Sequence, residues 1–565
     1  MSHWRALTDT LMPHLMLAPI ALPMLTAAVL LLLREEQQRL KFAISLLSTI
    51  AGLLVAVALL QWAHRGAGAA GMGVYLPGNW PAPFGIVLVL DRLSALMLLL
   101  TSMVALCSVL FAGARWQRAG VLYQALFQFQ LMGLGGAFLT GDLFNLFVFF
   151  EIMLAASYGL LLHGSGRARV QSGLHYIAIN LAASSLFLVG AAMLYGLTGT
   201  LNLADLARAV PQVAAADRGL LHAAAAILAT AFLIKAALWP LNFWLAPAYG
   251  AATAPVGALF AIMTKVGLYA LLRLWSLLFG AEAGPSAQFG GPWLVWGGMA
   301  TMAFGAMGMM GSQRLTQLAS HAAVLSSGTL LAAAGFGQNL LTAGLLYYLP
   351  SSTLAVAALF LLADLVERWR NDGATLAPYE SDEDAPFLSP ELVPAAGLNL
   401  DDDEQVLVGR VIPAATALLG LAYLTSTLVI AGLPPLSGFI GKLAMLTALL
   451  NPLGLGASTG VVPGPSGWAL LALMIGTGLL ALLALTRAGI RHFWASQGRG
   501  TPRLRVLEGL PVALLLGACM LLTLQAEGVM RFTQATANAL HAPDGYVRAV
   551  LTAKPRPSTT HEGAP

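Results

Sequence analysis

The chain has 565 residues, of which 58% are hydrophobic and only 10% charged, and its mean hydropathy is +0.78. A soluble domain carries far more surface charge, so this composition excludes a soluble protein. The net charge of +4 does not indicate nucleic-acid binding, because the basic residues are scattered through short loops and build no basic face. Apolar runs of about 18 residues or more recur along the chain and predict an all-α integral membrane protein.

About fourteen of these segments are expected to cross the membrane as helices. The predicted spans are residues 15–33, 42–60, 92–113, 121–139, 142–162, 172–197, 221–239, 254–278, 293–311, 315–335, 340–364, 411–450 (interrupted), 467–489 and 507–525. The first span is expected to be a retained helix rather than a cleaved signal peptide, because Arg34 follows it at once and no small-residue cleavage site is evident.

Basic residues between the spans predict the topology. Loops that follow odd-numbered spans hold roughly three times as many as loops that follow even-numbered spans. The even loops hold only Arg65, Arg92, Arg208, Arg218 and Arg273. Positive residues gather on the cytoplasmic side, so the odd loops are predicted to face the cytoplasm of a bacterial cell. Both termini are then predicted on the outer side of the inner membrane.

Two segments depart from the spanning pattern. Residues 199–210 are amphipathic and too short to cross, so we expect a helix at the membrane interface. Residues 366–410 hold nearly half of the chain's 25 acidic residues. We interpret them as a solvated cytoplasmic insert without fixed structure. The alternative is a docking site for a basic surface of a partner.

Lysine usage is the most informative feature. Only 5 of the 29 basic residues are lysine, and three of them, Lys235, Lys265 and Lys442, lie inside apolar segments. Arginine keeps its proton, whereas a desolvated lysine can lose it near neutral pH. Lysines reserved for the interior are therefore predicted to carry protons. The alternative, that they snorkel to an interface, is more tolerable for Lys442 than for the other two.

Glu151 is the matching acid, because it lies in the middle of the segment GDLFNLFVFFEIMLAASYGL. A glutamate–lysine pair inside the membrane is adjustable, since moving one partner changes the proton affinity of the other. The alternative is a static, neutral, hydrogen-bonded glutamic acid.

Histidines and aspartates near the spans are further candidates. His321 lies in the tenth span and is predicted either to relay protons between Lys265 and Lys442 or to make a hydrogen bond in a polar helix contact. Asp142 and His175 lie nearer helix ends and are weaker candidates for proton transfer. Asp91 and Arg92 are expected to pair at the entrance to the third span. Oxygens of Asp142, Asn145 and Asn180 are candidate cation ligands.

Prolines are expected to break two helices close to the buried lysines. Lys235 lies five residues before Pro240, and Lys442 lies seven residues after Pro435, which follows Pro434. A proline removes a backbone hydrogen bond, and broken helices in corresponding positions of two halves mark transport sites. Because the breaks fall in the seventh and twelfth spans, we predict two inverted five-helix repeats, spans 4–8 and 9–13.

Cofactor and metal sites are not expected. The two cysteines, Cys107 and Cys519, are too few for a disulfide framework, a zinc site or an iron–sulfur cluster. A phosphate-binding glycine loop is absent, and no haem or flavin signal stands out. The Met- and Gly-rich stretch at 302–311 is interpreted as helix packing rather than metal binding. These features favour a secondary transporter over an enzyme.

Three long motifs carry a family resemblance. The segments GDLFNLFVFFEIMLAASY, IKAALWPLNFWLAPAYGAATAPVGALFAIMTKVGLYAL and AGLPPLSGFIGKL resemble the antiporter-like membrane subunits that respiratory complex I shares with the multisubunit Na⁺/H⁺ antiporters of the Mrp, Sha or Pha type. The resemblance runs from about residue 70 to 450, and the first motif is most similar to the D-type subunits of these antiporters. It implies a fourteen-helix fold with two inverted five-helix units and a hydrated polar axis along the membrane midplane.

The resemblance also assigns roles to residues. Glu151 matches the fifth-helix glutamate of the family, and Lys235 matches the seventh-helix lysine that pairs with it. Lys265 matches the connecting lysine of the eighth helix, and Lys442 the terminal lysine on the broken twelfth helix. His321 falls in the polar motif of the tenth helix. The chain stops after the fourteenth span, which favours the D-type over the larger A-type of these subunits.

The repeat predicts four regions. Helices 1–3 occupy residues 1–120, and the two proton-channel halves occupy residues 121–278 and 293–489. The last helix and a C-terminal tail occupy residues 490–565. The expected partners are other membrane subunits of one complex, the lipid bilayer, H⁺ and Na⁺ or K⁺, and no nucleic acid. The first alternative is a proton-pumping component of a complex I or membrane hydrogenase. The second is a scaffold that transports nothing.

Overall fold

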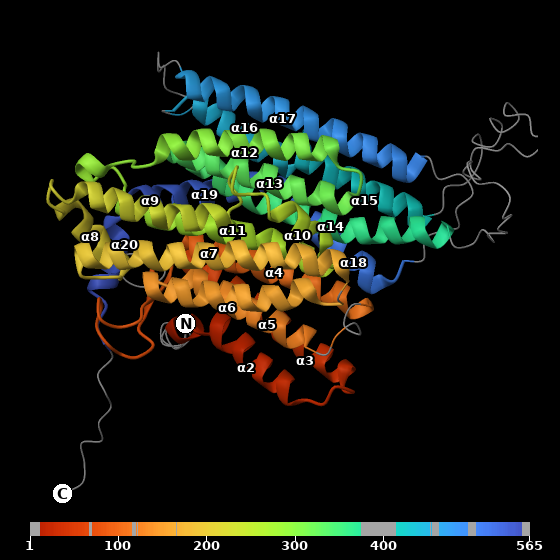
Figure 1. Cartoon of the computed structure of the whole chain (residues 1–565), viewed down its shortest axis with the longest axis horizontal. Coiled ribbons are helices and arrows are strands. Elements are labelled where there is room, and N and C mark those ends of the chain that lie inside the picture. The colour runs from red at the N-terminus through yellow and green to blue at the C-terminus, as the bar shows by residue number, and fades with distance from the viewer. Residues whose placement is uncertain are drawn as a thin grey trace, which may run out of the picture.

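The computed structural model describes residues 12–66, 71–115, 120, 122–164, 166–374, 414–452, 454, 463–494 and 504–555. Within these ranges the chain forms a bundle of long helices whose axes run side by side (Figure 1). The predicted acidic insert at 366–410 lies outside the described residues from position 375 onward.

The elements follow one another from α2 to α20. The first half contains α2 (Ala18–Leu32), α3 (Gln38–His64), β1 (Gly73–Tyr75), β2 (Leu88–Leu90), α4 (Arg92–Ala114), α5 (Tyr123–Leu139), α6 (Leu143–Leu162), α7 (Arg167–Thr198), α8 (Leu203–Ala209), η3 (Val210–Gln212), α9 (Arg218–Lys235), α10 (Leu245–Ala251) and α11 (Ala254–Leu278). The second half contains η4 (Gly284–Ser286), α12 (Gly291–Gly311), α13 (Leu315–Gly335), α14 (Asn339–Ala374), α15 (Ala414–Ala431), α16 (Ser437–Leu450), α17 (Pro465–Gly489), the π-turn η7 (Ile490–Trp494), α18 (Val506–Leu524), α19 (Ala526–His541) and α20 (Asp544–Leu551). The strands β1 and β2 pair antiparallel, with Val74 opposite Val89.

Twelve helices in the described ranges are long and apolar enough to cross a membrane, and α2 and α16 are shorter apolar helices. Each predicted span contains a helix, so the prediction of a helical multi-pass membrane protein is confirmed. The seventh span is broken between α9 and α10 and the twelfth between α15 and α16, as predicted. The two inverted repeats stay a prediction.

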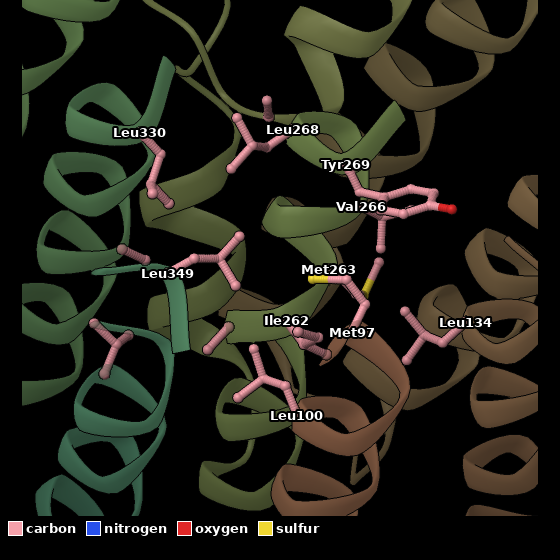
Figure 2. Packing of buried hydrophobic residues seen from close by; sticks show 14 of the residues in the cluster. Met97, Leu100, Leu134, Ile262, Met263, Val266, Leu268, Tyr269, Leu330 and Leu349 are labelled. Atoms are coloured by element: carbon pink, nitrogen blue, oxygen red, sulfur yellow. The ribbon is translucent and has the colours of Figure 1, made fainter. Parts of the chain in front are cut away.

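The helices α11 and α14 occupy the centre of the bundle. Ile262, Met263 and Val266 of α11 pack against Met97 of α4 and Leu349 of α14, as Figure 2 shows. A helix that is apolar on all sides has to be surrounded by other helices. Almost every residue of α11 is accordingly buried. Through α11 the first half of the chain contacts both α13 and α14 of the second.

Outer helices instead expose apolar side chains. Leu47 and Leu54 of α3 are each 66% exposed, and Leu521 of α18 is 59% exposed. A soluble protein does not expose such continuous apolar surface, whereas contact with lipid or other membrane helices covers it. The exposed leucines thus agree with the membrane interpretation of the composition.

Glycines bring α12 and α13 into close contact. A Cβ atom on Gly305 would lie 2.6 Å from the backbone nitrogen of Leu325, so no larger residue fits there without moving a helix. Met302 and Met309 are buried in the same contact. The structure therefore confirms that the stretch at 302–311 serves helix packing.

Arg169, Arg491 and Arg505 lie at one end of the bundle, which we call the arginine face. Arg505 donates to the carbonyl oxygen of Ala114 at 3.0 Å, and Arg169 to that of Ala251 at 3.0 Å. Arg491 binds the side chain of Gln313 at 2.8 Å. The sheet and the short helices α8 and α20 lie at the opposite end, where α20 packs against both α8 and β1 (Figure 1).

Two expectations about charged residues are wrong. Asp91 caps α4 by accepting a hydrogen bond from the backbone nitrogen of Ser94 at 2.9 Å, and its carboxylate binds Arg273 at 2.7 Å. Successive residues of a helix point in different directions, so Arg92 does not face Asp91. Arg273 lies within α11 instead of a loop, and its guanidinium packs over the ring of Tyr546 at 5.3 Å.

The Asp91–Arg273 pair is expected to contribute strongly to stability. Replacing Asp91 by alanine leaves a buried guanidinium without its partner, which costs about 3–5 kcal/mol in free energy of unfolding. The matched control is Glu527→Ala, because Glu527 pairs with Arg531 on the exposed surface, where ion pairs contribute little. Thermal unfolding of the detergent-solubilised protein measures both changes. Equal midpoints for the two variants would contradict the prediction.

Candidate functional site

The predicted proton carriers lie on helices that pack in one continuous series. Glu151 belongs to α6, Lys235 to α9, Lys265 to α11 and Lys442 to α16. The helix α6 packs against α7, α7 against α9, α9 against α11, α11 against α13 and α14, and α14 against α16 (Figure 1). The four side chains are thus distributed across the bundle from one half to the other.

Glu151 lies near the middle of α6, about 12 Å along the helix axis from its first residue. The side chain is partly buried, and the hydroxyl of Ser184 on α7 donates a hydrogen bond to its Oε1 atom. A carboxyl group at this depth therefore has a polar partner on the neighbouring helix, as membrane-buried polar groups require.

Lys235 is the last residue of α9 and is only 5% exposed. Among the described residues its Nζ atom has no hydrogen-bond partner and forms no salt bridge, although Glu151 lies within electrostatic range. The ammonium instead lies 5.2 Å from the centre of the Phe150 ring, a cation–π contact. The pair predicted between Glu151 and Lys235 is therefore close but separated in this structure.

Side chains make hydrogen bonds with backbone groups at the helix break after Lys235. Trp239 donates its backbone N–H to Thr301 Oγ1 at 2.8 Å, and Trp244 Nε1 donates to the carbonyl oxygen of Ile234 at 3.2 Å. Pro240 lies within this break, and its peptide bond with Trp239 is cis. Backbone groups released by a helix break in a membrane need such partners.

Lys265 lies in the middle of α11 and is 2% exposed. Its Nζ atom donates to Ser326 Oγ at 3.1 Å and to Ser327 Oγ at 3.2 Å, both on α13. The hydroxyl of Ser326 in turn donates to Ser352 Oγ on α14 at 2.9 Å. Both of these hydrogen bonds of the ammonium thus go to neutral hydroxyl groups, which can exchange protons with it.

The serines continue toward the second helix break. Ser351 adjoins Ser352 on α14, and its hydroxyl lies 2.8 Å from that of Ser437, the first residue of α16. We call Ser326, Ser327, Ser351, Ser352 and Ser437 the serine chain. It spans the distance from Lys265 to the helix that carries Lys442.

Lys442 is 7% exposed and reaches back to the end of α15. Its Nζ atom donates to the carbonyl oxygens of Ala431 at 2.8 Å and Ile430 at 3.4 Å. These carbonyls end a helix and carry its partial negative charge. Gly432 has a left-handed φ of 77°, and a Cβ atom there would lie 2.6 Å from Lys442 Cδ, so glycine is required. Pro434 and Pro435 follow within the break.

His321 lies apart from the buried lysines. Its Nδ1 atom is 3.0 Å from the carbonyl oxygen of Gln317 and 3.3 Å from Ser312 Oγ, and its side chain is partly exposed. It has no hydrogen bond with Lys265, Lys442 or the serine chain. The geometry favours the polar helix contact, and a relay role stays a prediction.

The weaker candidates lie at separate places. Asp142 caps α6 through a hydrogen bond from the backbone nitrogen of Asn145 at 2.9 Å. His175 is exposed on α7 and contacts the carbonyl oxygen of Gln171. Asn180 donates its amide to Tyr176 of its own helix. The three candidate cation ligands do not converge, and the described residues contain no cluster of three metal-binding side chains.

The serine chain was missed at the level of sequence. The signal that indicates it is a pair of adjacent serines in each of two otherwise apolar spans, HAAVLSSGTL and LPSSTLAV. Serines are common in membrane helices as packing residues, so the pairs alone do not distinguish packing from a proton path. The contacts between α11, α13 and α14 show that the two pairs meet beside Lys265.

Comparisons with known proteins extend over the whole chain. The family model described as NADH:quinone oxidoreductase/Mrp antiporter, transmembrane region, matches residues 140–381. The D-type component of a probable K⁺/H⁺ antiporter of Rhizobium meliloti is 50% identical over 97% of this chain and 99% of its own length. The D-type component of an Na⁺/H⁺ antiporter of Alkalihalophilus pseudofirmus is 32% identical over 96% of this chain and all of its own length.

A solved structure shares the fold. A chain of the Mrp complex from Dietzia sp. superposes with a TM-score of 0.78 at 27% identity, covering 96% of this chain and 100% of that one. The similarity includes both halves of the bundle, because nearly the full length of each chain is aligned.

Proposed function

Because the chain belongs to the family of D-type subunits of Na⁺/H⁺ and K⁺/H⁺ antiporters, we propose that it moves protons in a multisubunit monovalent cation/proton antiporter. The observation that carries this proposal is the Lys235 ammonium, which is buried beside Glu151 without a hydrogen bond among the described residues. A buried charge without a hydrogen-bond partner lowers the stability of a fold, so its presence at this place indicates a functional role.

The first step is a change of distance between Glu151 and Lys235. When the carboxylate moves away, the lysine loses the charge that favours its protonated form and releases a proton toward Lys265. When the carboxylate returns, Lys235 takes up another proton. Because the two groups are apart in this structure, a shift of α6 toward α9 closes the pair and the reverse shift opens it.

The second step carries the proton from Lys265 to Lys442. Lys265 donates a proton to Ser326, whose own proton passes to Ser352, and Ser352 gives its own proton to the water beyond it, so every hydroxyl is neutral before and after the transfer. Ordered water connects Ser352, Ser351 and Ser437 where no direct hydrogen bond links them. Lys442 receives the proton beside the last carbonyls of α15, which favour a positive charge. His321 is a further candidate for proton transfer in the second half of the chain.

Orientation and partners follow from the charge distribution and the family. We place the arginine face in the cytoplasm of a bacterial cell, which puts both termini on the outer side of the inner membrane. The exposed leucines of α3 suit contact with other membrane subunits or with lipid. In this scheme residues 121–278 form the first proton-channel half and 293–489 the second.

Everted membrane vesicles from cells that carry the complete gene cluster test the function. Addition of Na⁺ or K⁺ is expected to dissipate a preformed pH gradient, and vesicles from which only this chain is absent are expected to keep it. A pH-sensitive dye reports the gradient. If the cations have no effect and the addition of a reductant acidifies the vesicle interior, the alternative of a redox-driven proton pump replaces the antiporter.

A further inference from the structure

Two buried tyrosines and a partly buried one lie between Glu151 and the arginine face, and the relay described above does not use them. They are Tyr158 on α6, Tyr176 on α7 and Tyr249 on α10. We call these three residues the tyrosine ladder. Each comes from a different helix around the first break, so the fold, rather than one helical repeat, brings them together.

The inner end of the ladder is Tyr158. It lies seven residues after Glu151 on the same face of α6, about 10 Å nearer the arginine face. Its phenol lies within electrostatic range of the Glu151 carboxylate. The hydroxyl of Tyr158 is buried, yet it has no hydrogen-bond partner among the described residues.

Tyr176 forms the middle of the ladder. Its ring centre lies 5.4 Å from that of Tyr158, with the ring planes at 82°. Its hydroxyl is hydrogen-bonded to Ser157 Oγ at 2.8 Å, and the residue is completely buried. The two phenols also lie within electrostatic range of one another.

Tyr249 forms the outer end. Its phenol lies within electrostatic range of Tyr176, and Trp244 packs against both rings, at 5.2 Å from Tyr176 and 5.9 Å from Tyr249. Tyr249 is 1% exposed and its hydroxyl has no hydrogen-bond partner in the described ranges. Two residues further, the carbonyl oxygen of Ala251 binds Arg169 at the arginine face.

Further unpartnered polar atoms occur in the segments that flank α10, the helix of Tyr249. Besides the hydroxyls of Tyr158 and Tyr249, the side-chain oxygen of Thr253 and the amide nitrogen of Asn242 are buried without a partner in the part of the chain that the structure describes. Buried polar groups are almost always hydrogen-bonded, to protein or to ordered water. A packing cluster would use phenylalanine here, as Phe260 does between Tyr176 and Tyr249.

We propose that the tyrosine ladder, with ordered water between its hydroxyls, conducts protons between Glu151 and the arginine face. Each phenol accepts a proton from the water on one side and gives up its own to the water on the other. One proton therefore appears at one end for each proton that leaves the other, and every phenol stays neutral. This inference rests on the proposed function, because it supplies the Glu151–Lys235 pair with protons.

Phenylalanine substitutions test the ladder, since they remove the hydroxyl and keep the ring. Tyr158→Phe and Tyr249→Phe are expected to lower the maximal rate of cation/proton exchange at least about fivefold, the factor that corresponds to the loss of one ordinary hydrogen bond. The cation concentration for half-maximal rate is expected to stay unchanged. Tyr249→Phe is the decisive variant, because its hydroxyl holds no described protein group and its removal leaves the packing intact.

The matched control is Tyr123→Phe. Tyr123 is also buried with an unpartnered hydroxyl among the described residues, but it lies on α5 against His163, outside the ladder. Rates are measured in everted vesicles and divided by the amount of assembled complex. Full activity of Tyr158→Phe and Tyr249→Phe beside an inactive Lys235→Ala would overturn the ladder and leave the proposed function standing. An active Lys235→Ala would overturn the proposed function and the ladder with it.

Discussion

Vesicles that carry Lys235→Arg are expected to show no cation/proton exchange, although the complex assembles. Arginine keeps the positive charge beside Glu151 but does not release its proton in a protein, so it holds the site in one protonation state. Loss of a group that gives and takes a proton lowers a rate on the order of 100-fold or more. The dissipation of the pH gradient by Na⁺ or K⁺ measures this rate.

The control for this substitution is Lys554→Arg. Lys554 is exposed near the C-terminus, so the same chemical change there is expected to have no effect. Blotting of the purified complex distinguishes a transport defect from a failure to assemble. Wild-type exchange in Lys235→Arg would show that the charge alone matters, and it would exclude Lys235 as a proton carrier.

The second large effect is expected for Lys265→Met, which keeps the length of the side chain and removes the ammonium. Lys265 is the residue that joins the first half to the serine chain, through Ser326 and Ser327. Without it, a proton released by Lys235 has no acceptor on α11. We expect exchange to fall by about the same factor as for Lys235→Arg, on the order of 100-fold.

Ser326 and Ser327 provide a matched pair for the same step. Both accept a hydrogen bond from Lys265, but only Ser326 passes one on to Ser352. Ser326→Ala is therefore expected to slow exchange about fivefold, and Ser327→Ala less, since only the first breaks the chain. Equal rates for the two variants would contradict conduction through the serine chain.

Much of the fold could be predicted from the sequence because a membrane limits the choices. An apolar segment of about 20 residues has to be a helix when it crosses lipid. For this reason the predicted spans agree with the observed helices, and the prolines at 240, 434 and 435 lie within the breaks. The segment 199–210 contains a short helix as expected, α8 (Leu203–Ala209), and its place at the membrane interface stays a prediction.

Features that depend on contacts between distant segments could not be predicted. Asp91 binds Arg273 across 182 positions of sequence, and no local pattern indicates that partner. The last helices show the same limitation. Residues after the fourteenth span, interpreted as a tail, form α19 and α20, and α19 packs along α14, where His541 lies 2.9 Å from Thr342 Oγ1.

In the candidate site, too, some residues could be predicted from the sequence and others could not. Glu151 and the three lysines stand out in the sequence because a charge in an apolar span needs a reason. The serine chain and the tyrosine ladder do not, because hydroxyl side chains are tolerated in membrane helices at little cost. Their arrangement follows from how α6, α7, α10, α11, α13 and α14 pack, which one sequence does not reveal.

The most direct test of the account is the proton flux that a cation gradient drives through the purified complex in sealed liposomes. A pH dye enclosed in the liposomes records this flux for the wild type and for Lys235→Ala at equal amounts of assembled complex. We predict that an imposed Na⁺ or K⁺ gradient moves protons through the wild type and none above the empty-liposome background through Lys235→Ala. Equal proton flux through both would contradict the central claim that the buried lysine carries the proton.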